Sequence, residues 1–409
     1  MSKNHVITAT MAGATLLLAV AAWRSDAQRG DPPRQTSTIL GQALPGLTEE
    51  QQQAFTEGLQ KFSTVETREE GLGPVFNGTT CAECHKAGAI GGAGIDLTIS
   101  RVTRIGGIRN GVYSDLTDFG GPVLQARSLK EFDTSCPIDG ETVPRQSNRA
   151  NIFASLRITT PLFGVGLIEA IPAETILART RQNDPDGVQG VANIQMNPET
   201  GKKEVGRFGW KSQHSSLHRF SGDAYLNEMG ITSQFFPDDN LPQGKPIPPG
   251  WETVPGDDID EDVEAFTTFM RLLAPPGRLL PLTPQVQEGE RLFQQIRCTS
   301  CHTPEMKTGA NPIAALSKQS VPLYSDLLVH RMGRNLADGI QQGLAQGDQF
   351  RTAPLWGASR RRFFLHDGRA NNVEEAILHH GGEATASRDR FTRLQERDKA
   401  ALRAFIHSL

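Results

Sequence analysis

The chain has 409 residues, a formal net charge of −4 at pH 7 and five cysteines. This length allows two or three domains with their own hydrophobic cores. The small net charge argues against a nucleic-acid-binding protein or one with a strongly charged partner. Glycine and proline are plentiful, with 41 and 25 residues, so we expect many turns and short elements between the helices.

The first residues have the pattern of an export signal. A polar start with Lys3 precedes an almost continuous apolar run over residues 6–22, and small residues surround Ala27. This pattern predicts a cleaved signal peptide over residues 1–27. An uncleaved membrane anchor is the alternative, because the run approaches the length of a membrane span. Either way we expect a periplasmic body, and no later segment is apolar for long enough to span a membrane in the mature chain.

The next residues lead into the first domain. Residues 28–45 are polar and contain prolines, so we expect a flexible lead. Thr48 and Gln51 then form the pattern of a capping box, which predicts a helix that begins at residue 49. Between residues 95 and 129, short β-branched runs alternate with glycines, and this pattern predicts β-hairpins.

The strongest signal in the chain is the pattern C-x-x-C-H, which occurs as CAECH at residues 81–85 and as CTSCH at residues 298–302. This is the attachment pattern of a c-type haem, in which two thiols bind the porphyrin vinyl groups and the histidine ligates the iron. The alternative, a zinc or redox C-x-x-C before a chance histidine, would have to occur twice. We therefore predict two covalently bound haem c groups, attached through Cys81, Cys84, Cys298 and Cys301, with His85 and His302 as iron ligands.

Each motif has its own expected domain. Pro275 and Pro276 stop a predicted helix, and we place the domain boundary there. Residues 46–276 then form an N-terminal haem domain with large insertions, and residues 277–409 form a C-terminal cytochrome c-like domain. Thr283 with Pro284 predicts the start of the helix before the second motif. A phenylalanine stands five residues before the first cysteine of both motifs, Phe76 and Phe293, and we expect each against a porphyrin.

Other side chains are candidates for a second iron ligand. Met332 follows His302 at a distance usual for a distal methionine of a cytochrome c domain, and methionine ligation raises the haem potential. His330 is an alternative in the same stretch. In the N-terminal part, His214, His218 and Met229 are further candidates, each with solvation or core packing as the plainer alternative.

One carboxylate stands out as a candidate acid or base. Glu169 is the single charged residue of an apolar run over residues 161–172. Burial would raise its pKa and make it a usable proton donor or acceptor. The alternatives are an ion pair, for example with Arg157, and a helix cap.

Several further stretches carry a resemblance. GLIEAIP (166–172), GRFGW (206–210), YSDLLVHRMG (324–333), RTAPLWG (351–357), LHDGRA (365–370) and HHGGEA (379–384), together with both haem motifs, resemble the di-haem oxidoreductase family. Its members are also named peroxidases or thiol-oxidoreductase-like proteins. More distantly, the chain is similar to bacterial di-haem cytochrome c peroxidases and MauG-type enzymes. The resemblance implies a mainly α protein with two cytochrome c-like domains, one covalent haem each, and irregular stretches and short β-hairpins inserted in the N-terminal domain.

Two positions depart from that resemblance. Peroxidases of this type place a methionine ligand just before the His-Asp-Gly that corresponds to residues 366–368, and this chain has Leu365 there. The family usually shows His-Asp-Met where this chain has Arg331 between His330 and Met332. The first departure removes one ligand, whereas the second leaves Met332 as a candidate.

The resemblance implies electron transfer from a C-terminal haem to a reactive N-terminal haem. We expect a periplasmic oxidoreductase of the cytochrome c peroxidase type, with Trp210 or Trp356 between the haems as a relay or as packing. Its partners would be a small redox protein, a cytochrome c or a cupredoxin, and hydrogen peroxide or another oxidisable substrate. The alternatives are a non-catalytic di-haem electron-transfer cytochrome c and a MauG-like oxidation of an organic or protein substrate.

Overall fold

The structure is a computed structural model that describes residues 39–145, 151–181, 183–254 and 259–409. The described residues all belong to one compact unit of the chain. The predicted signal peptide and most of the predicted lead lie outside the described residues. Within the described part, no helix combines the length and the apolar composition needed to cross a membrane.

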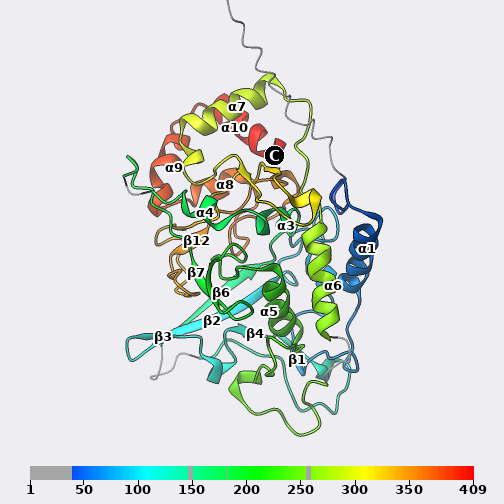
Figure 1. The fold of residues 1–409 in the computed structure, drawn as a ribbon. Coiled ribbons are helices and arrows are strands. Elements are labelled where there is room, and N and C mark those ends of the chain that lie inside the picture. The colour runs from blue at the N-terminus through cyan, green and yellow to red at the C-terminus, as the bar shows by residue number, and fades with distance from the viewer. Residues whose placement is uncertain (1–38, 146–150, 182, 255–258) are drawn as a thin grey trace, which may run out of the picture. The chain divides into compact units, whose positions relative to one another are not determined.

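Strands contribute more than expected, and the expectation of a mainly α protein is wrong. The structure is 32% helical with 15% strand. The longest strands are β2 (Arg101–Arg109) and β6 (Asn151–Ile158), which pair antiparallel with Arg101 opposite Ile158. β3 (Val112–Ser114) and β4 (Val123–Leu124) pair with the other edge of β2 and complete a four-stranded sheet (Figure 1). The β-branched runs thus belong to one sheet.

One hairpin of this sheet is the kind that the sequence predicts. Asn110 and Gly111 connect β2 to β3, with φ values of 51° and 80°. Positive φ at both central residues is the requirement of a type I′ turn, whose twist matches that of the strands. The hairpin prediction is therefore confirmed at β2 and β3.

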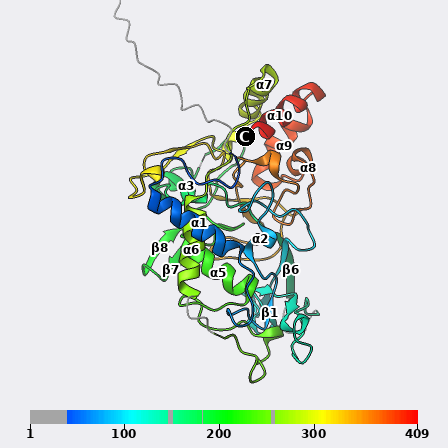
Figure 2. The ribbon, with the colours of Figure 1, turned by 90° about the vertical axis from the view of Figure 1, so that its right-hand side faces the viewer.

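Three helices pack together in the N-terminal part. Helix α1 (Glu49–Ser63) begins at the predicted capping box, because Gln51 N donates to Thr48 Oγ1 at 3.2 Å and Thr48 N donates to Gln51 Oε1 at 3.1 Å. Its buried ring Phe62 lies 5.0 Å from the ring of Phe269 on α6 (Ile259–Leu272). Helix α5 (Leu217–Met229) also packs against α6 (Figure 2).

The C-terminal part has a second apolar core. Helix α7 (Pro284–Gln295) is capped by Thr283, as predicted, and packs against α10 (Glu396–Ser408). Between them, the ring of Phe293 lies 5.2 Å from Phe405 and 6.0 Å from Tyr324. The predicted domain division at Pro275 and Pro276 stays a prediction.

The remaining helices and strands are short. The strands form antiparallel pairs, β1 with β5, β7 with β8, β9 with β10 and β11 with β12. Their bounds, and those of the helices, are α2 (Cys81–Cys84), α3 (Val165–Glu169), α4 (Ala173–Leu177), α8 (Val373–Leu378), α9 (Thr385–Thr392), β1 (Val75–Phe76), β5 (Arg127–Ser128), β7 (Ile194–Asn197), β8 (Lys202–Val205), β9 (Met306–Lys307), β10 (Ser320–Val321), β11 (Val329–Arg331) and β12 (Gln349–Arg351).

Candidate functional site

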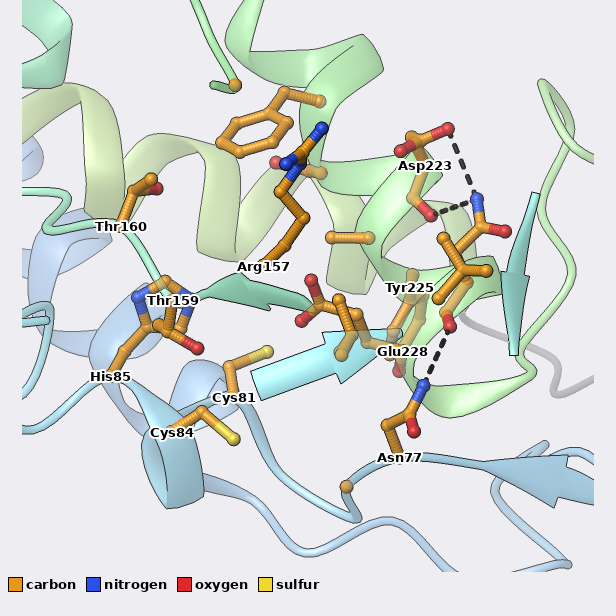
Figure 3. Close-up of a pocket in the computed structure, with 18 of the residues that line it drawn as sticks. Asn77, Cys81, Cys84, His85, Arg157, Thr159, Thr160, Asp223, Tyr225 and Glu228 are labelled. Atoms are coloured by element: carbon orange, nitrogen blue, oxygen red, sulfur yellow. Dashed lines mark hydrogen bonds between the residues drawn. The ribbon is translucent and has the colours of Figure 1, made fainter. Parts of the chain in front are cut away.

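A cavity of about 1260 Å³ lies at the first C-x-x-C-H motif (Figure 3). Cys81 and Cys84 on the short helix α2 line it, and both thiols are free of disulfides. His85 follows α2 and lines the same cavity. The two thiols and the imidazole of the motif thus line one cavity, as attachment of a haem requires.

The His85 ring is half-buried and neutral. Burial lowers the pKa of His85 to about 4, so the ring keeps a lone pair for a metal at neutral pH. Phe62 packs edge-on against it, with ring centroids 5.8 Å apart. Phe76, which was expected here, stacks on Phe132 at 5.9 Å instead and is not among the residues that line the cavity.

Helix α5 contributes two carboxylates to the first cavity, Asp223 and Glu228 (Figure 3). Burial raises the pKa of Glu228 to about 7, the charge of Asp223 adds to the rise, and Arg104 opposes it. The carboxyl group of Glu228 has no hydrogen-bond partner among the described residues. A carboxyl group with this pKa can gain or lose a proton near neutral pH, as a general acid or base must.

Asp223 and Arg104 supply fixed charges around Glu228. Burial alone would raise the pKa of Asp223. Its Oδ2 lies 3.4 Å from Nε2 of His214, however, and this contact together with the charges of Arg104 and Arg219 outweighs the effect of burial. The net result is a lowered pKa for Asp223. Arg104 lines the cavity, and its Nε is buried without a hydrogen-bond partner in the described part of the chain. The first cavity therefore joins an ionised carboxylate, a titratable carboxyl group and a guanidinium.

The predicted acid/base residue Glu169 lies outside both cavities. Its Oε1 accepts from the backbone N–H of Leu217 at 2.7 Å, and its Oε2 accepts from Nε of Arg271 at 2.8 Å. These are the ion-pair and helix-capping roles that stood as the alternatives. The position of Glu169 thus gives no support to a catalytic role.

Of the other N-terminal ligand candidates, one lies at the first cavity and two do not. Met229 is buried and lines the first cavity. His214 pairs with Asp223 as described, and His218 Nδ1 lies 3.2 Å from Oε1 of Glu199. Neither histidine lines either of the two cavities.

The second C-x-x-C-H motif lies at a cavity of about 1520 Å³. Cys298 and Cys301, also free thiols, line it together with Phe293. His302 Nδ1 lies 2.9 Å from the carbonyl oxygen of Tyr324, which assigns the ring proton to Nδ1 and leaves Nε2 open. Metal-ligating histidines are commonly held in this way. Burial lowers the pKa of His302 to about 4.

His330 lines the second cavity, but both of its ring nitrogens are occupied. Nε2 lies 2.9 Å from Oδ2 of Asp326, and Nδ1 lies 2.8 Å from Oε2 of Glu383. Burial lowers the pKa of His330, yet the two carboxylates outweigh it, and the pKa is raised well above the usual value. A protonated ring is no metal ligand. Met332 lines the cavity from the same segment.

Two more histidines line the second cavity, His366 and His380. The ring of His366 stacks on Phe350 at 4.1 Å with an interplanar angle of 13°. Nδ1 of His380 lies 2.7 Å from the carbonyl oxygen of Ala376. No sequence pattern predicted either histidine as a ligand.

Two arginines of the second cavity have no carboxylate partner among the described residues. Arg351 donates to the carbonyl of Arg207 at 2.9 Å, Arg361 donates to that of Pro354 at 2.6 Å, and the Nε of each is buried and unpaired. Burial lowers the pKa of each to about 10, so both stay charged. Two thiols, an open imidazole nitrogen and unpaired guanidinium groups fit a haem, which carries two vinyl groups, an iron and two propionates.

Three residues line both cavities, Ile158, Thr159 and Trp210. The indole Nε1 of Trp210 donates to the carbonyl oxygen of Ile158 at 2.8 Å. Trp356 belongs to the apolar core and lines neither cavity. Of the two tryptophans singled out in the sequence, Trp210 is therefore the one in the wall that the cavities share.

Comparison with known families gives one clear match. A family model described as "di-haem oxidoreductase, putative peroxidase" matches residues 121–409. This range is more than half of the chain and includes the second haem motif, but it begins after the first. No curated protein matches the sequence.

Among solved structures, hydrazine synthase from Kuenenia stuttgartiensis is 15% identical with a TM-score of 0.40, over 100% of both chains. The di-haem peroxidase BthA from Burkholderia thailandensis is 15% identical with a TM-score of 0.32, over 61% of this chain and 78% of that one. A MauG-like protein associated with microbial copper homeostasis is 15% identical with a TM-score of 0.29, over 61% and 88%. Similarities of this size support no conclusion about function.

Proposed function

Because this chain belongs to the di-haem oxidoreductase family, we propose that it is a peroxidase-type enzyme with one covalent haem c in each cavity. Cys81, Cys84 and His85 would hold one haem, and Cys298, Cys301 and His302 the other. When bound, each haem supplies an iron that changes its oxidation state. The proposal of a haem at the first motif is supported only by residues 81–85 and their cavity, because the family match begins after these residues.

The observation that supports catalysis is Glu228 in the first cavity. Reduction of one hydrogen peroxide takes up two electrons and two protons and releases two waters, and within it a proton moves from one peroxide oxygen to the other. The ionised carboxylate of Glu228 would accept that proton and return it. A pKa of about 7 leaves Glu228 partly ionised at neutral pH, and Arg104 stabilises the charge.

The second cavity is suited to electron storage. Its acidic residue Glu383 is already engaged, because Oε2 contacts His330 and Oε1 accepts from the backbone N–H of Arg331 at 3.0 Å. No free carboxyl group comparable to Glu228 is described in that lining. Trp210, in the shared wall, would carry electrons between the two haems.

The location and the partner are proposed from the sequence. Residues 6–22 have the composition of an export signal, and c-type haems are attached outside the cytoplasm. We propose a periplasmic enzyme that takes electrons from a small cytochrome c or cupredoxin.

The test is peroxide turnover by purified holoprotein, compared between Glu228→Gln and the wild type. Loss of a general base lowers the rate by about 10²–10⁴-fold, so this loss is expected in kcat/KM for peroxide. Glu169→Gln is the matched control, since Glu169 lies outside both cavities, and its rate should stay near that of the wild type. An unchanged rate in Glu228→Gln would contradict the role of Glu228. If the wild-type holoprotein does not turn over peroxide, the protein is instead an electron carrier or a MauG-like oxidase of another substrate.

A further inference from the structure

The second cavity contains more histidines than its motif requires. His302 comes from the motif, and His330, His366 and His380 join it in the lining. A haem iron has two axial positions, and His302 takes one of them. Since Leu365 has no donor atom, the other position falls to Met332 or to one of the three extra histidines.

Two of those histidines are poorly suited to bind iron. His330 has a carboxylate on each ring nitrogen. His366 lies flat on Phe350, and the charges of Arg157, Arg369 and Lys211 act on it. No hydrogen bond from a described residue fixes which nitrogen of His366 carries the proton. A further cation at His366 would add to an already positive environment.

His380 follows helix α8 and lines the second cavity. Val373, Ala376 and Ile377 line the second cavity, with the i, i+3, i+4 spacing of one helix face. His380 lies two residues beyond the end of α8 and lines the same cavity, whereas the adjacent His379, the C-cap of α8, is not among the lining residues. The segment after α8 thus places one histidine of the pair at the cavity.

The His380 ring is held in the same way as the His302 ring. Nδ1 of His380 lies 2.7 Å from the carbonyl of Ala376, and Nδ1 of His302 lies 2.9 Å from that of Tyr324. Each bond leaves Nε2 as the open nitrogen, which is the usual preparation of a metal-ligating imidazole. Met332 has a flexible side chain that no described hydrogen bond orients.

We propose that Nε2 of His380 is the second axial ligand of the haem held by His302, so that this haem has two imidazole ligands. The inference rests on haem attachment at Cys298 and Cys301, which is part of the proposed function. Since methionine ligation raises the haem potential, two imidazoles give this haem a lower potential than Met332 would.

The test is spectroscopic and uses the full-length holoprotein. The oxidised wild type should show a low-spin ferric signal in electron paramagnetic resonance and lack the near-infrared band of a methionine-ligated ferric haem. His380→Ala should lose that low-spin signal, gain a high-spin one and recover the low-spin form when imidazole is added. His379→Ala, the adjacent control, should keep the wild-type spectrum, and so should Met332→Leu.

Further variants and a haem count keep the result interpretable. If His380→Ala does not fold, His380→Met should gain the methionine band and a higher midpoint potential. The inference is overturned if the wild type has the methionine band, or if Met332→Leu, and not a His380 variant, loses the low-spin signal. Mass spectrometry of the peptide with Cys298 and Cys301 distinguishes a failure of haem attachment from a wrong choice of ligand. A peptide without haem contradicts the proposed attachment, whereas a peptide with haem leaves only the ligand in question.

Discussion

Nε1 of Trp210 lies 2.8 Å from the carbonyl oxygen of Ile158, and both residues line both cavities. Ile158 is the last residue of β6, which pairs with β2 along its whole length. The sheet therefore fixes the indole in the wall that the two cavities share. With a haem in each cavity, as proposed, this ring would lie in the wall between the two haems.

Trp210→Phe is expected to slow electron transfer between the haems. The variant removes the indole and its hydrogen bond, which costs about 1 kcal/mol of stability, so the fold should persist. Stopped-flow absorption after reduction of one haem would measure the transfer rate. Trp356→Phe is the control, because Trp356 lines neither cavity. Equal rates in both variants would remove Trp210 from the pathway.

The pH dependence of peroxide turnover should follow Glu228. Its pKa is raised to about 7, and the ionised form is the proposed base, so kcat/KM should rise as the pH increases through about 7. kcat/KM reports the ionisation of the free enzyme. Glu228→Gln should have a low and flat profile over the same range. If kcat/KM of Glu228→Gln still rises with pH as it does in the wild type, the ionisation of another group causes that rise.

The stability of the protein should show a pH effect from Glu66. Burial raises its pKa from 4.5 to about 7, although the hydroxyl of Tyr225 donates to Oε1 at 3.1 Å and opposes the rise. The folded state thus holds this proton more tightly than the unfolded state, and the wild type loses stability as the pH rises from 4.5 to about 7.

Glu66→Gln removes that titration and keeps an oxygen for Tyr225. Its free energy of unfolding in urea, relative to the wild type, should therefore increase across this pH range. Glu57→Gln, on the exposed face of α1, is the control and should give a difference that does not change with pH. A constant difference for Glu66→Gln as well would mean that Glu66 ionises normally.

His330→Ala should be strongly destabilising. It leaves the carboxylates of Asp326 and Glu383 facing each other without the imidazolium between them. Removal of one partner from a buried ionic cluster costs about 3–5 kcal/mol, which urea unfolding would measure. His218→Ala removes a more exposed pair with Glu199 and should cost about 1 kcal/mol or less. Similar losses in the two variants would contradict the account of the cluster.

Local patterns predicted local structure well. The caps of α1 and α7 depend on Thr48, Gln51 and Thr283 with their immediate neighbours, and each has the predicted contacts. The sheet was missed because β2 and β6 pair across a long separation along the chain, which no short window contains. The expectation of a mainly α protein came from the family resemblance, which depends on the haem motifs and other short stretches and not on the strands.

The proposed acid/base residue, Glu228, could not be predicted from the sequence for a related reason. Glu169 stands out in its apolar run, but Arg271 and the N–H of Leu217, both remote in the sequence, engage its carboxylate. Glu228 sits between Asn227 and Met229 without any local signal, and only the packing of α5 places it at the first cavity. His380 lies beyond the end of α8, so the apolar spacing of that helix does not select it over His379, and only the packing of the segment places it at the second cavity.

The most direct test of the central claim is electron paramagnetic resonance of the oxidised and half-reduced holoprotein, with and without hydrogen peroxide. The account predicts a high-spin ferric signal from the haem at Cys81 and Cys84, which peroxide removes. A variant without those two thiols should lack that signal and keep the low-spin haem at His302. Two low-spin signals that ignore peroxide in both redox states would contradict the enzyme and leave a di-haem electron carrier.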